Sequence, residues 1–237
     1  MISIPLVLSY EHECSYLEET TAQSMFVHPS FPINNAIYSA LIQQGFRRSG
    51  DEVYRPHCTN CSACIPARIA VNDFNPSRNQ NRCLKKNHQT LAVIKPPVFQ
   101  ADHYELYLRY QNHRHSFGDM ANSSAEEYLN FLSSQWCDTQ FVEFFIDGQL
   151  VCVAIVDQLD NALSAVYTFF DPAYSSYSPG VYAVLWQIEQ AKKLQKEFLY
   201  LGFWIESCKK MAYKNQYQPL QLLIEQTWKT LLDNNIV

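Results

Sequence analysis

Long hydrophobic runs are missing from this sequence of 237 residues. No apolar stretch approaches the ~18 residues that a helix needs to cross a bilayer, although 47% of the residues are hydrophobic. The amino terminus also lacks the features of a secretory signal. The apolar stretch at residues 1–8 is short, contains no basic residues, and is followed at once by Glu11 and Glu13. These absences argue against a membrane or secreted protein, and we expect a cytoplasmic globular protein with a large buried core.

Eight cysteines are present, and in a reducing compartment disulfide bridges are not the favoured interpretation of them. Cys58, Cys61 and Cys64 form a short run whose two-residue spacing lets thiolates converge on one site. Because three ligands do not complete a tetrahedral site, we expect Cys14 to be the fourth, with Cys83 in reserve. The run predicts a structural zinc ion or an iron–sulfur cluster, and ordinary core thiols are the alternative. The remaining cysteines are expected to pack as small apolar side chains: Cys137, Cys152 and Cys208.

The net charge of −5 conceals an uneven distribution. Residues 47–88 contain eight basic and three acidic residues, a net charge of +5, whereas the rest of the chain contains ten basic and twenty acidic residues. A basic segment on an acidic body is typical of a protein that binds a polyanion such as RNA, because phosphate binding releases counterions. A solvated basic surface is the alternative interpretation.

The order of helical and extended patterns predicts an α+β protein without internal repeats. Helices are expected over residues 77–88, 101–115 and 181–194, and from about Pro219 onward. A further helix begins at Asn34 or Asn35 and ends at Gly45, and another, which carries residues 128–132, begins at Ser123 or Ser124, because each of these serines has a glutamate three residues later. Strands are expected over residues 46–48, 53–55, 65–71, 90–94, 141–146, 150–156, 162–170 and 198–203. We divide the chain into a basic, cysteine-containing region, residues 1–97, and a second region, residues 98–237.

Several short motifs occur along both of these regions. In the first they are residues 14–17, 45–50, 54–56 with the cysteine run, and 74–78. In the second they are residues 118–120, 165–172, 200–205 and 210–214. Together the motifs resemble the arginyl-tRNA protein transferase family, most closely its compact bacterial branch of aspartate/glutamate leucyltransferases. The resemblance covers nearly the whole chain.

This resemblance implies an enzyme that moves leucine from leucyl-tRNA to proteins beginning with Asp or Glu and so marks them for degradation by the N-degron route. It also implies a GNAT-type acyltransferase domain for residues 98–237 beside a smaller cysteine-containing α/β region. The chemistry itself requires no cofactor. Arginine as the donated amino acid stays open, because the residues alone do not choose between the two donors.

Aminoacyl transfer is the aminolysis of an ester that the ribose already activates, so the enzyme must chiefly align an amine with a carbonyl. An α-amine has a pKa of ~7.7–8.0, and a nearby base needs only to accept its proton during attack. We expect this chemistry at the end of the strand 162–170, with Tyr167 and Asp171 facing the reacting groups and Tyr182 as a proton relay. Asp171 followed by Pro172 is also a common strand-terminating turn.

An acidic first residue on the acceptor needs a cation that can donate hydrogen bonds to both oxygens of its carboxylate, as arginine does. Arg78 and Arg82, four residues apart on one predicted helix, are the expected pair, and Arg47 and Lys214 are the alternatives. Contacts with tRNA phosphates are expected from Arg47, Arg48, Lys85 and Lys86. Lys209 and Lys210 are further candidates near the acceptor end of the RNA.

Two other classes of function fit parts of the sequence. A GNAT acetyltransferase that uses acetyl-CoA would need a glycine-rich loop for the pyrophosphate, and residues 174–180 contain a single glycine. A non-catalytic RNA-binding module stabilised by a bound metal would resemble the zinc fingers that bind nucleic acids. Those fingers carry paired histidines, and none follow Cys64 at the required spacing. Both interpretations are therefore weaker than the transferase.

Overall fold

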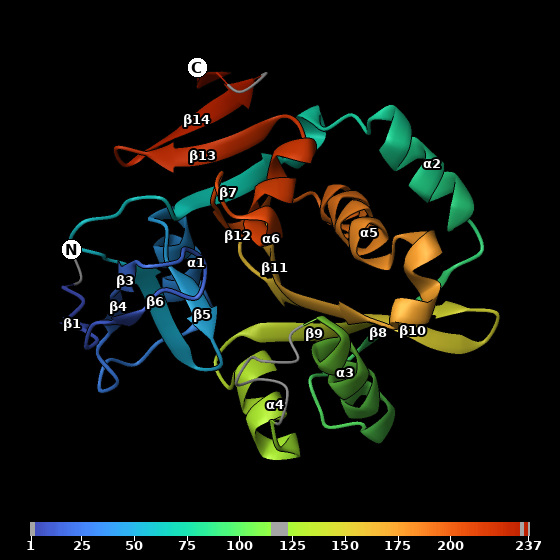
Figure 1. Ribbon diagram of the computed structural model, residues 1–237, viewed down its shortest axis with the longest axis horizontal. Coiled ribbons are helices and arrows are strands. Elements are labelled where there is room, and N and C mark those ends of the chain that lie inside the picture. The colour runs from blue at the N-terminus through green and yellow to red at the C-terminus, as the bar shows by residue number, and fades with distance from the viewer. Residues whose placement is uncertain (1–2, 115–122, 233–234, 237) are drawn as a thin grey trace.

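The computed structural model describes residues 3–114, 123–232 and 235–236, which leaves the expected loop 116–122 and the motif 118–120 outside the described residues. Within the described part, nine strands form one mixed sheet, here called the large sheet (Figure 1). In spatial order they are β15 (Asn235–Ile236), β14 (Thr227–Leu232), β13 (Leu220–Ile224), β7 (Ile65–Ala70), β12 (Phe198–Trp204), β11 (Ala162–Phe170), β10 (Gln149–Gln158), β9 (Asp138–Ile146) and β8 (Leu91–Lys95).

A smaller antiparallel sheet, here called the small sheet, lies beside the large one (Figure 1). Its strands are β1 (Leu6–Leu8), β4 (Ser24–Val27), β6 (Glu52–Pro56) and β5 (Arg47–Ser49). A separate two-stranded pair joins β2 (His12–Glu13) to β3 (Thr21–Ala22). The predicted hairpin between residues 46–48 and 53–55 is confirmed as β5 and β6.

Helices cover both faces of the large sheet (Figure 1). One face carries α5 (Pro179–Lys193), with α2 (Arg78–Lys86) packed outside it, and the other carries α3 (Ala101–Arg114) and α4 (Ala125–Leu132). The remaining helical segments are α1 (Asn35–Gln43), α6 (Lys209–Ala212), η1 (Val71–Asp73), η3 (Pro172–Tyr177) and η4 (Tyr213–Gln216). Among these described helices, none combines the length and the apolar character that crossing a bilayer requires. We predicted an α+β protein, and the structure confirms a fold that mixes helices and strands around one large sheet.

Side-chain caps define where the helices begin. The Asn34 side chain accepts a hydrogen bond from the backbone N–H of Ile37 at 2.9 Å and so caps α1. Ser77 and Ser124 each begin a capping box, because their hydroxyls accept from the N–H three residues later while that residue's side chain accepts in return. The predicted starts of α1, α2 and α4 are therefore confirmed.

The predicted helix after Pro219 is wrong. This segment forms the antiparallel strands β13 and β14, and β13 pairs with the edge of β7 through Leu220 and Leu222. Both leucines are fully buried. Their two-residue period matches a strand, and pairing with β7 satisfies backbone groups that a helix would have left at an open sheet edge. Tertiary pairing therefore overrides the helical pattern.

Residues from both sides of the expected division at residue 97 contribute to the large sheet. β7 and β8 come from the first region, and they pair with β12 and β9 of the second. The cysteine run lies between β6 and β7, so it connects the small sheet to the large one.

A buried ion pair fastens the small sheet to the large sheet. Arg48 in β5 is 1% exposed, and it donates hydrogen bonds from Nε and Nη2 to the two carboxylate oxygens of Asp157 in β10, at 2.6 and 2.7 Å. It also donates to the backbone oxygens of Leu132 and Gly50, while the Thr139 hydroxyl donates to Asp157 at 2.8 Å. The prediction that Arg48 contacts tRNA phosphates is therefore wrong, because its guanidinium is buried and fully occupied within the core.

Removing the Arg48 guanidinium would leave the Asp157 carboxylate buried without its cation. We expect Arg48→Met to lower the free energy of unfolding by about 3–5 kcal/mol, the usual result of breaking one half of a buried ion pair. Urea unfolding followed by circular dichroism measures the difference. Arg78→Met, which removes an exposed arginine from α2, is the matched control and should change it by less than about 0.5 kcal/mol. Equal losses in the two variants would contradict this role of Arg48.

Candidate functional site

Two neighbouring parallel strands separate in the middle of the large sheet. β11 and β12 pair only from Ala162 opposite Phe198 to Ser164 opposite Tyr200. Farther along, β11 pairs with β10 and β12 pairs with β7, so in the described residues their facing edges have no strand partner. We call the space between residues 165–170 of β11 and 201–204 of β12 the strand splay.

Irregularities in both strands lie where they separate. In β11, Val166 is an extra residue between Ala165 and Tyr167, which pair with consecutive residues of β10. In β12, Leu201 is the extra residue before Gly202, whose φ is +73°. Such bulges bend a strand away from its neighbour, and a positive φ favours glycine. The splay is therefore built into the local backbone of both strands.

The Arg47 guanidinium lies across the strand splay. Its Nη2 donates a hydrogen bond to the backbone oxygen of Val166, on the β11 side. On the β12 side, a Cβ atom added at Gly202 would overlap the guanidinium, so Arg47 occupies the room that this glycine leaves. Sequence analysis missed this role of Gly202, although a glycine inside an apolar strand pattern signals a close approach.

A second cation lies near Arg47. Lys214 in η4 is 3% exposed, and its Nζ donates to the backbone oxygen of Phe203 in β12. Burial, followed by the positive charge of Arg47, lowers the pKa of Lys214 to about 7. Among the described residues, neither cation forms an ion pair with Asp or Glu. The two cations together can receive an anion such as a carboxylate.

Of the four cysteines that we expected to converge, Cys14, Cys58 and Cys61 lie close enough to Cys64 to affect its pKa. Burial raises the pKa of the Cys64 thiol to about 12, and the nearby thiols of Cys14, Cys58 and Cys61 raise it further, whereas Lys214 opposes the rise. The cysteine group therefore adjoins the strand splay. Over residues 3–114, 123–232 and 235–236, however, no group of three or more His, Cys, Asp or Glu side chains has the arrangement of a metal site.

Cys83, the reserve ligand, lies elsewhere. It is buried in α2, and its sulfur lies 3.8 Å from the backbone oxygen of Tyr177 in η3. The three cysteines that we expected in the core, Cys137, Cys152 and Cys208, are confirmed as buried.

A cavity of about 220 Å³ opens beside the cysteine run. Its lining residues include Arg55, His57, Cys64, Phe203 and Glu225. Because Lys214 donates to the Phe203 oxygen, the cavity adjoins the second cation of the splay.

Of the three residues that we predicted for catalysis, Tyr182 lies apart from Tyr167. Tyr167 lies in the α3 side of the core, where its hydroxyl accepts a hydrogen bond from Gln111 Nε2 at 3.1 Å. Tyr182 lies in α5 on the opposite face, edge-on to Phe144, so the structure does not support a relay from Tyr182 to Tyr167. Asp171 accepts from the Ala173 N–H at 2.9 Å and lies 3.5 Å from Arg109, as expected of a capped turn.

The expected carboxylate-binding pair, Arg78 and Arg82, lies on the exposed side of α2 with Lys85 and Lys86. Figure 1 places α2 outside α5 and far from β5, the strand that carries Arg47. No hydrogen bond or ion pair among the described residues links this helix to the strand splay. The structure therefore supports the alternative pair, Arg47 and Lys214, as the cations of one site.

The arrangement of layers also occurs in a solved structure of another protein. A solved structure of the C-terminal domain of a putative lysylphosphatidylglycerol synthetase from Agrobacterium fabrum superimposes with a TM-score of 0.51 at 10% sequence identity. The match covers 81% of this chain and 62% of that chain. At this identity the likeness shows a shared fold and nothing about activity.

Sequence comparison identifies the family. The family models described as Arginine-tRNA-protein transferase, N terminus and C terminus match residues 12–82 and 102–224. The aspartate/glutamate leucyltransferase of Alcanivorax borkumensis is 50% identical over 224 residues, covering 94% of this chain and 93% of that protein. The enzyme of the same name from Pseudomonas syringae pv. tomato is 50% identical over 220 residues, covering 93% and 94%. This chain belongs to the arginine-tRNA-protein transferase family, which confirms the resemblance seen in its motifs.

Proposed function

We propose that this protein transfers leucine from leucyl-tRNA to the amino-terminal Asp or Glu of acceptor proteins. The observation that carries the proposal is 50% identity, over 94% of the chain, to a protein named aspartate/glutamate leucyltransferase. A GNAT-like fold supports it, because that fold is used for acyl transfer. We further propose that the reaction occurs in the cytoplasm and marks the acceptor for degradation.

The strand splay is the proposed place of the reaction. Aminolysis of the aminoacyl ester produces an oxyanion, which needs hydrogen-bond donors that are already in position. In the splay, backbone N–H groups of β11 and β12 are released from pairing with each other and can supply such donors. Tyr167 follows the bulge directly, and it remains the proposed group for proton transfer beside the splay.

Arg47 and Lys214 are the proposed receptors for the acidic side chain of the acceptor. The Arg47 guanidinium keeps donors beyond the one that binds Val166, and guanidinium donors match the two oxygens of a carboxylate. A bound carboxylate would also favour the charged form of Lys214, whose pKa burial and Arg47 lower to about 7. These contacts support acceptors that begin with Asp or Glu over neutral ones.

The exposed basic side of α2 is the proposed contact for tRNA phosphates. Arg78, Arg82, Lys85 and Lys86 lie within nine residues of one helix and are all exposed. Exposed cations that follow one helix suit a phosphate backbone, since each contact releases a counterion. This assignment replaces the buried Arg48 and leaves Arg47 for the acceptor.

Cys14, Cys58, Cys61 and Cys64 are the proposed ligands of a structural zinc ion or iron–sulfur cluster. Four thiols are a suitable donor set for either group, and the effect of Cys14, Cys58 and Cys61 on the pKa of Cys64 supports placing all three near it. Such a group would connect the two sheets, because the run joins β6 to β7. The transfer chemistry itself does not require it.

The proposed activity predicts a defined pattern of donors and acceptors. Purified protein should transfer labelled leucine from leucyl-tRNA to peptides that begin with Asp or Glu, and not to a peptide that begins with Ala. Transfer from arginyl-tRNA instead would identify the alternative donor, and acetylation by acetyl-CoA would identify an acetyltransferase. Binding of tRNA without any transfer would leave a non-catalytic module.

Two matched variants test the acceptor site in the same assay. Arg47→Ala should lower kcat/KM for the Asp peptide by about 100-fold, because the carboxylate loses a charge-assisted bidentate partner. The double variant Arg78→Ala/Arg82→Ala should change it by less than about threefold at saturating tRNA. A large loss in Arg78→Ala/Arg82→Ala together with a small loss in Arg47→Ala would instead place the acceptor site on α2.

Neutralising the end of α2 should weaken tRNA binding and reduce its dependence on salt. For Lys85→Gln/Lys86→Gln, the slope of log K against log salt concentration should become shallower by up to about 2, or ~0.9 for each lost phosphate contact. Filter binding of leucyl-tRNA over a series of salt concentrations measures the slope. Lys229→Gln, on β14, should leave it unchanged. An unaltered slope in the α2 variant would exclude these contacts.

The thiol group predicts bound metal in protein that is purified without oxygen or chelators. Elemental analysis should find zinc or iron in the unmodified protein, and Cys58→Ser should lose it because one of four thiolate ligands is removed. Cys83→Ala, which changes a cysteine outside the group, should retain the metal. Metal-free protein, or equal loss in both variants, would refute the proposed ligand set.

A further inference from the structure

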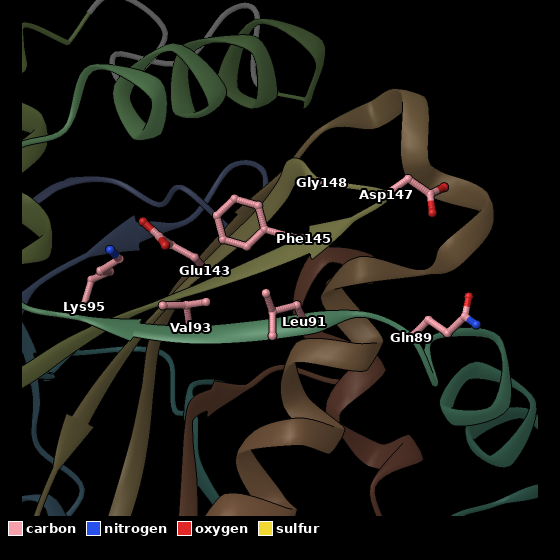
Figure 2. Close-up of a pocket in the computed structure, with 8 residues that line it drawn as sticks. All are labelled: Gln89, Leu91, Val93, Lys95, Glu143, Phe145, Asp147 and Gly148. Carbon is pink, nitrogen blue, oxygen red and sulfur yellow. The ribbon is translucent and has the colours of Figure 1, made fainter.

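A second cavity lies far along the large sheet from the strand splay, over β8 and β9. It has a volume of about 480 Å³ and is lined by alternate residues of the two strands. Figure 2 shows these side chains standing on one side of the sheet, with Gln89 and Asp147 at one end and Lys95 at the other. Leu91 and Phe145 lie between the two ends. We call this cavity the β8–β9 groove.

The shape and position of the groove fit an extended chain. β8 is the last strand of the large sheet, and within the described part of the chain its outer edge has no strand partner. Leu91, in the groove, is 61% exposed although it belongs to a strand. An open edge beside exposed apolar side chains is a template for adding another strand, and alternate side chains of that strand would face the groove.

A buried carboxylate gives the groove a charge preference. Glu143 lines the cavity but is only 3% exposed, and its Oε1 shares a hydrogen bond of 2.7 Å with His103 Nε2 of α3. No other hydrogen bond to this carboxylate is found among the described residues, and Glu143 is one of the residues that line the cavity. Asp147 adds negative charge at one end, whereas Lys95 adds positive charge at the other. Cations are therefore favoured over Glu143 and near Asp147.

We propose that the β8–β9 groove binds an extended segment of a protein partner, which pairs with the free edge of β8 and directs a lysine or arginine side chain to Glu143. The register of β8 and β9 places Val93 opposite Glu143 and Leu91 opposite Phe145. Val93 is small enough for a long basic side chain to pass over it to Glu143. In an antiparallel partner strand, an acidic residue faces Lys95, followed at every second position by a basic, an apolar and a basic residue.

Fluorescence anisotropy with a dye-labelled heptapeptide tests this proposal on the full-length protein. The peptide carries glutamate, lysine, leucine and lysine at its first, third, fifth and seventh positions, with threonine between them. It should bind saturably, and a peptide with lysine and glutamate exchanged should bind at least about tenfold more weakly, because its charges oppose those of the groove. Methylating the backbone amides of the first peptide should also weaken binding, because strand pairing needs their N–H groups.

Substitutions on the two faces of β8 provide the matched control. Leu91→Lys, in the groove, should weaken binding of the first peptide by about tenfold, whereas Ile94→Lys should change it by less than twofold. Ile94 is 44% exposed in the same strand, but it pairs opposite Val142 on the face that packs against α5. Asp147→Asn should weaken binding without touching the buried His103–Glu143 pair, and Glu143→Gln should weaken it more.

The outcomes separate the parts of the proposal. Saturable binding that Leu91→Lys weakens and Ile94→Lys does not supports the groove. Absence of binding, or equal effects of these two variants with native circular dichroism spectra, overturns it. Equal binding of the two charge patterns overturns the role of Glu143, and equal binding of the methylated peptide overturns pairing with β8.

Discussion

The position of the candidate site depends on the buried ion pair between Arg48 and Asp157. Placing both charges in the core costs hydration energy, which two short hydrogen bonds between them and further bonds from Arg48 to backbone oxygens offset. Successive residues of a strand face opposite sides. Because Arg48 faces Asp157, Arg47 must face the other way, and there it meets the strand splay. One core interaction therefore orients a cation that belongs to the site.

The strand splay exposes backbone oxygens inside the protein, and the two cations satisfy them. An unpaired carbonyl that is buried costs free energy, and here Arg47 binds the Val166 oxygen while Lys214 binds the Phe203 oxygen. Gly202 leaves the room that the guanidinium needs. The same contacts that stabilise the separated strands thus concentrate positive charge between them, with no carboxylate in the described residues to neutralise it.

Local signals in the sequence predicted most of the fold, and long-range partners explain where prediction failed. The side chains of Asn34, Ser77 and Ser124 accept hydrogen bonds from backbone N–H groups three residues later, so the sequence indicates where those helices start, although it leaves Asn35 and Ser123 as alternative caps. Arg48 and Lys85 are both cations in a basic segment, and only Asp157, 109 residues away, makes one of them a core residue. The strands after Pro219 depend in the same way on the edge of β7. Pairing over such separations leaves no local pattern.

The cysteine run is a second connection between the small sheet and the large sheet. It follows β6, the strand that pairs with β5, and β5 carries Arg48. This pairing places Tyr54 opposite Arg47, and the run leads into β7, which β12 and β13 hold on both sides. The end of the run is therefore fixed in the large sheet, while its beginning is fixed in the small one. Any bond among the four thiols would shorten the free path between these points and limit how far β5 can move from the splay. Arg47 is thus held from two sides. The ion pair of the adjacent Arg48 fixes it on one side, and the cysteine run that follows β6 restrains it on the other.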